Sequence, residues 1–321
     1  MQSFELLSRK FALHFDKAHF PASPASLYEP NDYFLRLGGK RVRPVLCLMG
    51  NEMFEDVRED AWELATAVEL FHNFTLIHDD IMDKAPLRRG METVHTKYGE
   101  STALLAGDVM LVKAYEYLSK IEGTFLHPIL MLFNQTAREV CEGQQLDMDF
   151  EKQERVVLDE YLRMIELKTS VLLAGSLKMG AILGGAGERN QNLLYEFGRK
   201  LGIAFQVQDD YLDAFGDPAK FGKQVGGDIL ANKKTFLLIH ALETASGATL
   251  EELRRQLATN EENKVQQVQA IFRECKVDEW ALELKNKYLD EAFQHLDDIA
   301  VVSRRKEPLA DLARFLVQRD Y

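Results

Sequence analysis

The chain has 321 residues, 46% of them hydrophobic, so it can bury a large core, and its net charge at pH 7 is −12. This excess of acid argues against a surface that binds nucleic acid or anionic membranes. Its three cysteines are too few and too scattered for a disulfide framework or a zinc site, which favours a reducing cytoplasm.

Helices are predicted almost throughout the chain. Residues 2–20 follow a helical pattern that Pro21 should end, and they lack the basic and apolar segments of a signal peptide. The apolar run 171–182 is too short to span a bilayer, so we expect no membrane insertion. Residues 61–78 are apolar on nearly every face, which is typical of a buried helix. Further helices are predicted over residues 26–36, from about 45, and over 100–119, 124–146, 157–184, 190–216, 233–245, 250–258, 263–275, 278–299 and 307–319, with irregular segments over 84–99 and 216–232.

No run of alternating β-branched residues competes with these helices. Helical periodicity also continues across residue 150, where a division into two equal domains would fall. We therefore predict an all-α protein in which residues 1–321 form a single domain, a large helical bundle.

Two Asp-Asp-x-x-Asp motifs, at residues 79–83 and 209–213, are the most informative feature of the sequence. Both follow apolar helices, so each should lie near a helix C-terminus, where negative charge is unfavourable. The first and last aspartates of each motif share a helix face. Carboxylates without competing His or Cys favour Mg²⁺, which shares its coordination shell with phosphates and water. The six carboxylates of the two motifs predict a metal and diphosphate site between two facing helices.

A basic loop, residues 38–43, precedes the helix expected after Pro44. Two glycines let its backbone approach an anion, and Lys40 and Arg43 can bind phosphate oxygens. The pair Arg88-Arg89 directly follows the first aspartate motif. Each of these groups alone is compatible with a solvated basic turn or with structural ion pairs, but beside a metal site they favour a phosphate clamp.

Further polar side chains lie near the two motifs along the chain. Alone, each would be an ordinary core or surface residue. Gln206 lies three residues before Asp209 and therefore on the same helix face. The set comprises His72 before the first motif, and Lys168, Thr169, Gln206, Lys223 and Lys233 around the second.

Together these residues resemble the trans-isoprenyl diphosphate synthases, or polyprenyl synthetases, which are chain-elongating prenyltransferases. The likeness runs from about Gly38 to Lys233 in the family's order, without departure at the principal motif positions. The resemblance implies a helical bundle of the isoprenoid synthase type with a central cleft, and a homodimer. Its segments are 38–44, 79–83 with 88–90, 107–108, 143–147, 168–170, 205–210, 221–223 and 232–235.

By this resemblance, an allylic diphosphate binds through Mg²⁺, with three ions around the bound diphosphate. The implied metal ligands are Asp79, Asp80, Asp83, Asp209 and Asp213. Its ionisation leaves an allylic cation, which the double bond of isopentenyl diphosphate attacks before a proton is lost. The implied catalytic residues, which stabilise the cation, are Lys168, Thr169 and Gln206. The implied ligands are Arg88, Lys168, Lys223 and Lys233 for the allylic diphosphate, and Lys40, Arg43, His72 and Arg89 for isopentenyl diphosphate.

Product length should follow from the depth of the pocket beside the helix that carries Asp79. Phe74 lies about 7.5 Å and Phe71 about 12 Å along this helix from Asp79. Thr75 is small where the eukaryotic C15 synthases of the family carry a second aromatic residue, and the insertion typical of bacterial C15 synthases is absent. The pattern resembles C20 synthases, so geranylgeranyl diphosphate is the expected product and farnesyl diphosphate the alternative; both phenylalanines could also be ordinary core.

Two other classes of function share parts of this pattern. Class I terpene cyclases and head-to-head synthases also ionise diphosphates with aspartates and Mg²⁺, but they lack a dedicated isopentenyl diphosphate site, so the loop 38–43 argues against them. A non-catalytic partner subunit usually loses aspartates from one motif, whereas both motifs are complete here.

Overall fold

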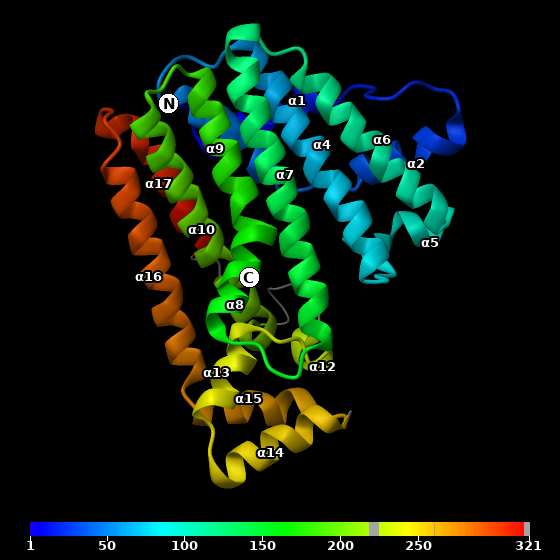
Figure 1. Cartoon of the computed structure of the whole chain (residues 1–321), viewed down its shortest axis with the longest axis vertical. Coiled ribbons are helices and arrows are strands. Elements are labelled where there is room, and N and C mark those ends of the chain that lie inside the picture. Colours follow the sequence, from blue (N-terminus) through cyan, green and yellow to red (C-terminus); the bar gives the residue numbers. More distant parts are fainter. Residues whose placement is uncertain (218–224, 260, 318–321) are drawn as a thin grey trace. The chain divides into compact units, whose positions relative to one another are not determined.

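The computed structural model describes residues 1–217, 225–259 and 261–317. The regular secondary structure of its described residues is helical apart from one short hairpin, so the all-α prediction is confirmed (Figure 1). No helix in these described ranges has both the length and the apolar character needed to cross a membrane. Lys223 and the segment 221–223 lie outside the described residues.

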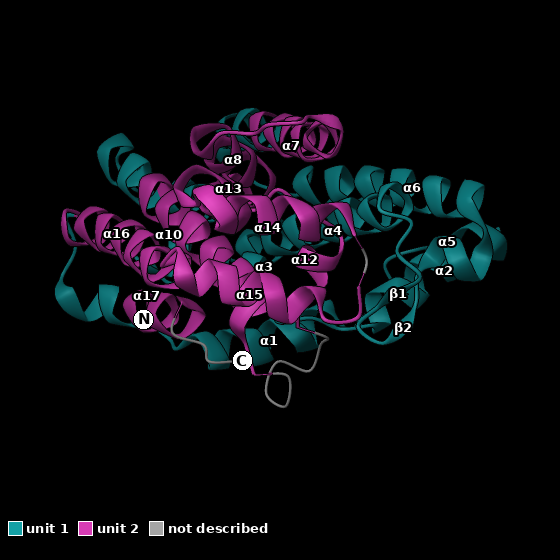
Figure 2. Ribbon diagram, turned by 90° about the horizontal axis from the view of Figure 1, so that it is seen from below, with its two compact units in different colours: residues 1–134, 175–194, 300–308 teal, residues 135–174, 195–299, 309–321 magenta. Residues whose placement is uncertain are grey.

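The chain forms two compact units, each assembled from separate stretches (Figure 2). Unit 1 comprises residues 1–134, 175–194 and 300–308, and unit 2 the remainder. Four of the five boundaries fall within helices, and the fifth, after Ile299, falls in the short segment between α16 (Val277–Asp297) and α17 (Ser303–Val317). That residues 1–321 form one domain stays a prediction. Four helices contribute residues to both units: α7 (Gly123–Lys152), α9 (Val171–Leu183), α10 (Glu188–Phe215) and α17 (Ser303–Val317).

Unit 1 is organised around α4, which carries the first aspartate motif at its C-terminal end. As its apolar pattern predicts, α4 is buried along most of its length and packs against α1, α2, α3, α5 and α6. The elements of this unit are α1 (Phe4–Phe15), α2 (Ala25–Arg36), α3 (Val42–Glu52), α4 (Glu59–Met82), β1 (Leu87–Arg88), β2 (Met91–Glu92), α5 (Val94–Tyr98) and α6 (Glu100–Leu118).

Unit 2 has its own hydrophobic core, in which α13 packs against α8, α15 and α16. The helix predicted over residues 157–184 is interrupted here by the π-helical turn η1, a feature that periodicity does not reveal. The elements wholly in this unit are α8 (Leu158–Ile165), η1 (Glu166–Ser170), α12 (Gly227–Leu230), α13 (Phe236–Thr244), α14 (Gly247–Ala258), α15 (Lys264–Glu274) and α16 (Val277–Asp297).

The segment 84–99, predicted to be a loop, is in fact ordered as a small hairpin followed by α5. Leu87 pairs with Glu92 and Arg88 with Met91, across a turn in which Arg89 and Gly90 both have positive φ. Such a turn normally contains Asn-Gly or Asp-Gly, so the sequence signal was weak.

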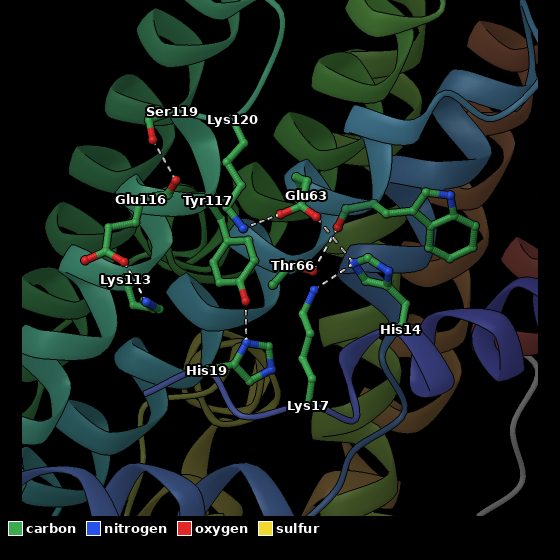
Figure 3. Close-up of polar contacts among 11 residues, drawn as sticks. His14, Lys17, His19, Glu63, Thr66, Lys113, Glu116, Tyr117, Ser119 and Lys120 are labelled. Atoms are coloured by element: carbon green, nitrogen blue, oxygen red, sulfur yellow. Dashed lines mark hydrogen bonds and ion pairs between the residues drawn. The ribbon is translucent and has the colours of Figure 1, made fainter. Parts of the chain in front are cut away.

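α1 ends at Phe15 rather than at residue 20, because His19 folds back onto it. The Nε2–H of His19 donates to the Phe15 carbonyl (2.9 Å), which also accepts the backbone N–H of Lys17 (2.8 Å) at the helix end. His19 Nδ1 is therefore an acceptor, and it receives the hydroxyl proton of Tyr117 on α6 (2.8 Å; Figure 3). Both nitrogens are thus satisfied by a neutral ring.

The buried His19 should make stability depend on pH. Burial lowers its pKa from 6.5 to about 4. The unfolded chain takes up this proton below pH 6.5 and the folded protein does not. The stabilisation is therefore complete above pH 6.5, and up to about 3 kcal/mol is lost as pH falls towards 4. Chemical denaturation of wild type and His19→Gln between pH 7 and 4.5 should show a shallower loss in the variant. His127→Gln, at an exposed histidine, is the matched control; equal slopes in wild type and His19→Gln would contradict the assignment.

Candidate active site

In unit 1, the first aspartate motif lies at the end of α4, as predicted. Asp79 is half-buried, and Asp83 is exposed at the C-cap, where its N–H donates to the Asp79 carbonyl (2.8 Å). Their carboxylates are one turn apart on a helix end that already carries partial negative charge. The arrangement therefore favours a bound cation.

Asp80 differs from its neighbours because it is 1% exposed and already paired. The Arg88 guanidinium donates from Nε to both carboxylate oxygens (2.9 Å each) and approaches Oδ1 with Nη2 (2.8 Å). The hairpin that carries Arg88 is thereby fixed to the end of α4. Asp80 thus holds a phosphate-binding candidate in place, in addition to any role as a ligand.

The basic loop is bent sharply, as its glycines predict. Gly38 and Gly39 have φ of 77° and 151°, and Arg41 is left-handed at the N-cap of α3. A side chain at Gly39 would bring its Cβ to 3.0 Å from Arg89 Nη2, so glycine lets the loop contact this arginine. Arg41 is held by an ion pair with the buried Glu69 of α4. Lys40 is exposed.

His72 contacts Arg43, whose Nη1 lies 3.0 Å from His72 Nε2. Because a guanidinium only donates, this nitrogen accepts and the proton is on Nδ1. Burial, followed by the charges of Arg43, Arg89, Arg88 and Arg41, holds the pKa of His72 well below its usual value. His72 is therefore neutral, and four guanidinium groups act on one imidazole.

The candidate product-length residues lie on α4 in an aromatic cluster. Phe71 is 1% and Phe74 9% exposed, with ring centroids 5.7 Å apart. Phe71 meets Phe133 edge-on, and Phe74 meets His78 edge-on at 4.7 Å. Thr75 is half-buried, and its hydroxyl donates to the His72 carbonyl (2.8 Å). Phe74 is thus the ring of the pair nearer to the motif.

In unit 2, Lys168 and Thr169 lie on the π-helical turn η1. A Cβ at Gly143 would overlap the backbone nitrogen of Lys168, and one at Gly202 would overlap Ser170. These two glycines let α7 and α10 pack directly on the turn. π-helical turns occur preferentially at functional sites, because they alter the direction of the backbone and side chains.

A chain of hydrogen bonds links η1 to the second aspartate motif. Thr169 donates to Gln206 Oε1 (3.1 Å), and Gln206 Nε2 donates to Asp210 Oδ1 (2.9 Å). The Tyr161 hydroxyl donates to Asp210 Oδ2. The two proposed catalytic side chains, Thr169 and Gln206, are therefore brought together.

Burial raises the pKa of Asp210 to about 7. The Asp228 carboxylate adds to this rise, whereas the bonds from Tyr161 and Gln206 and the Lys233 charge oppose it. A carboxyl so far from its ordinary pKa, in a hydrogen-bonded network, is typical of an active site.

The other candidates of unit 2 surround this network. Lys168 Nζ donates to Asp147 Oδ2 (2.6 Å). Asp213 Oδ2 accepts the backbone N–H of Asp228 (2.9 Å), which ties the second motif to α12. Asp209 is half-buried, and Lys233 is exposed three residues beyond α12.

No group of three or more His, Cys, Asp or Glu side chains among the described residues is arranged to hold a metal ion by itself. Mg²⁺ needs few protein ligands when diphosphate and water complete its shell. The donor set fits that ion, because Asp79 and Asp83 offer hard oxygen ligands at one helix end. Asp209 and Asp213 offer the same chemistry in unit 2.

Sequence reasoning overlooked three partners of the candidate residues. Glu69 holds Arg41, Asp147 holds Lys168, and Tyr161 holds Asp210. Asp147 belongs to the segment 143–147 that carries the family resemblance, so the sequence indicated that it could be functional. The sequence did not indicate Glu69 or Tyr161. Glu69 is 28 residues from its partner Arg41, and Tyr161 is 49 residues from its partner Asp210.

Comparison with known proteins identifies relatives of this chain. The family model described as polyprenyl synthetase matches residues 24–275. A geranylgeranyl diphosphate synthase of Methanosarcina mazei is 40% identical over 303 residues, covering 93% of this chain and 91% of the relative.

Two solved structures are informative. The crystal structure of a geranylgeranyl pyrophosphate synthase is 42% identical, with a TM-score of 0.95 over 99% of each chain. That of a polyprenyl synthase from Caulobacter crescentus CB15, complexed with calcium and isoprenyl diphosphate, is 27% identical. Its TM-score is 0.87, over 99% of this chain and 98% of that one.

Proposed function

Since this chain belongs to the polyprenyl synthetase family and is a prenyltransferase, we propose that it condenses isopentenyl diphosphate with allylic diphosphates to form C20 geranylgeranyl diphosphate. Geranylgeranyl diphosphate synthases are among the relatives that share 40% or more of its residues over almost the whole chain. The shared fold and motifs support the same class of reaction here.

The observation that carries the proposal is the cationic cluster of unit 1. The charges of Arg41, Arg43, Arg88 and Arg89 all act on His72. Glu69 and Asp80 offset part of this charge. Such a concentration of guanidinium groups, on the basic loop and on the hairpin that it contacts, suits a diphosphate. A cyclase needs no second diphosphate site, so the cluster favours elongation.

We propose that Asp79, Asp80, Asp83, Asp209 and Asp213 hold Mg²⁺, with three ions around the bound allylic diphosphate. When bound, Mg²⁺ would supply positive charge to the diphosphate leaving group. The calcium in the Caulobacter crescentus complex supports a divalent metal in this family.

The remaining steps use the side chains of this chain. Arg88, Lys168, Lys223 and Lys233 hold the allylic diphosphate and stabilise the charge it gains as its C–O bond breaks. Lys40, Arg43, His72 and Arg89 hold isopentenyl diphosphate, whose double bond attacks the resulting cation. Neutral His72 contributes its Nδ1–H rather than a charge. The cation is stabilised by the oxygen dipoles of Thr169, Gln206 and the Lys168 backbone. The proton that is then lost passes to the released diphosphate.

We also propose that the protein forms a homodimer and that it is located in the cytoplasm. The support for a dimer lies in exposed apolar residues on α6 and α7. Leu104, Leu105 and Val112 are at least half exposed on α6, as is Met131 on α7. Exposed large apolar side chains that neighbour one another are typical of an interface.

The test is an incubation of the protein with isopentenyl diphosphate and dimethylallyl, geranyl or farnesyl diphosphate, with and without Mg²⁺. We expect Mg²⁺-dependent elongation that ends at C20. An end at C15 would keep the reaction and replace the product by farnesyl diphosphate. No elongation of any primer by the folded protein would favour a terpene cyclase or a partner subunit instead.

A further inference from the structure

Lys264, the first residue of α15, is fully buried in unit 2. Lysine is almost never buried completely unless it is paired. Within the ranges that the structure describes, Lys264 makes no ion pair, and its ammonium donates one hydrogen bond, to Asn232 Oδ1 (2.8 Å). Burying an ammonium against a neutral amide is costly, so this contact must be held by its surroundings.

Asn232 accepts this bond from a left-handed backbone, and both ends of its side-chain amide are hydrogen-bonded. Its backbone is left-handed, with φ of 52°. Its Nδ2 donates to the Leu257 carbonyl in the last turn of α14 (3.0 Å). Lys264 only donates and the carbonyl only accepts, so the orientation of the Asn232 amide is fixed from both sides. Asn232 therefore joins the loop after α12 to both α14 and α15.

Lys233 follows Asn232 directly, and its backbone N–H donates to the Asp228 carbonyl (2.9 Å). At the other end of the same segment, the Asp228 N–H donates to Asp213 of the second aspartate motif. Lys233 thus lies on a short segment whose other end contacts the second motif, and Lys264 holds this segment through Asn232.

We propose that Lys264 is a positioning residue: its bond to Asn232 fixes the loop from which Lys233 binds the allylic diphosphate. The proposal rests on the function proposed above. It requires that Lys264 acts on the allylic substrate only through Asn232 and Lys233, and that isopentenyl diphosphate is unaffected.

The test compares Lys264→Met with Lys287→Met, a matched change at an exposed lysine of α16. Methionine fills a similar volume without an ammonium, so Lys264→Met removes the hydrogen bond to Asn232 with little change in packing. We expect its KM for geranyl diphosphate to rise about tenfold, as for partners that orient a ligand residue. The KM for isopentenyl diphosphate should stay unchanged, and Lys287→Met should match wild type in both.

A double-mutant cycle separates positioning from a general loss of structure. In a Lys233→Ala background, Lys264→Met should raise the KM for geranyl diphosphate no further, because the residue through which it acts is gone. Effects that multiply in the double variant would overturn the proposal. So would a folded Lys264→Met protein with the KM of Lys287→Met.

Two further arms keep the result decisive. Asn232→Gly removes the same bond while allowing a left-handed backbone, so it should raise the same KM even if Lys264→Met fails to fold; an unchanged KM would overturn the proposal. The rise in Tm caused by Mg²⁺ with inorganic pyrophosphate measures diphosphate binding without elongation. If wild type does not elongate, the proposed function fails. A smaller rise in the Tm of Lys264→Met than in that of Lys287→Met would still support the positioning role. Equal rises in Tm would overturn it.

Discussion

Asp79→Asn should lower kcat/KM for elongation by a factor of about a hundred to a thousand, the usual cost of removing one charge-stabilising group from an active site. Its carboxylate is the half-buried member of the first motif, and it is the best placed to share a cation with a diphosphate. Asparagine keeps the shape but loses the charge that binds Mg²⁺.

The same substitution also removes a like-charge repulsion within the motif. Asp79 and Asp83 are like charges one turn apart at a helix C-terminus, so removing one relieves repulsion of a few tenths of a kcal/mol. Steady-state kinetics and a thermal melt without metal would measure both effects. Asp56→Asn, at an exposed aspartate outside the site, should change neither. A variant with wild-type kcat/KM would remove Asp79 from the proposed metal site.

Phe74→Ala should lengthen the product beyond C20. Phe74 lies between the first motif and Phe71 on α4, so removing its ring opens space along the path proposed for the growing chain. The truncation of a mostly buried phenylalanine should also cost about 3 kcal/mol of stability, so the assay needs a temperature at which the variant stays folded. Chromatography of the dephosphorylated products would report chain length.

Phe20→Ala is the control for this experiment, because Phe20 is a half-buried phenylalanine of the same unit outside α4. It should reduce packing without changing the product. An unchanged product distribution in Phe74→Ala would mean that Phe74 is ordinary core and that residues of other helices limit the chain. The C20 proposal would then rest on the relatives alone.

The positions of the helices and of both aspartate motifs followed from the sequence. Residues 61–78 are apolar all round, and α4 is buried as that pattern predicts. Errors arose where a specific hydrogen bond or turn overrides the periodic pattern of the helices. His19 ends α1 early, and the Arg89-Gly90 turn forms a hairpin within a predicted loop. Neither contact leaves a periodic trace in the sequence.

The candidate site divides in the same way. The sequence by itself determined which residue types lie near the site. They are aspartates four residues apart at a helix end, a basic loop with two glycines, and aromatic residues that precede the first motif on the same helix. These depend on spacing along one helix or loop, and helix geometry is the same in every protein. Only the tertiary structure decided their chemical states, namely that Asp80 is paired with Arg88, His72 is neutral, and Lys264 is buried against Asn232. A protonation state or an ion pair depends on burial and on charges brought from distant parts of the chain, and these exist only once the chain has folded.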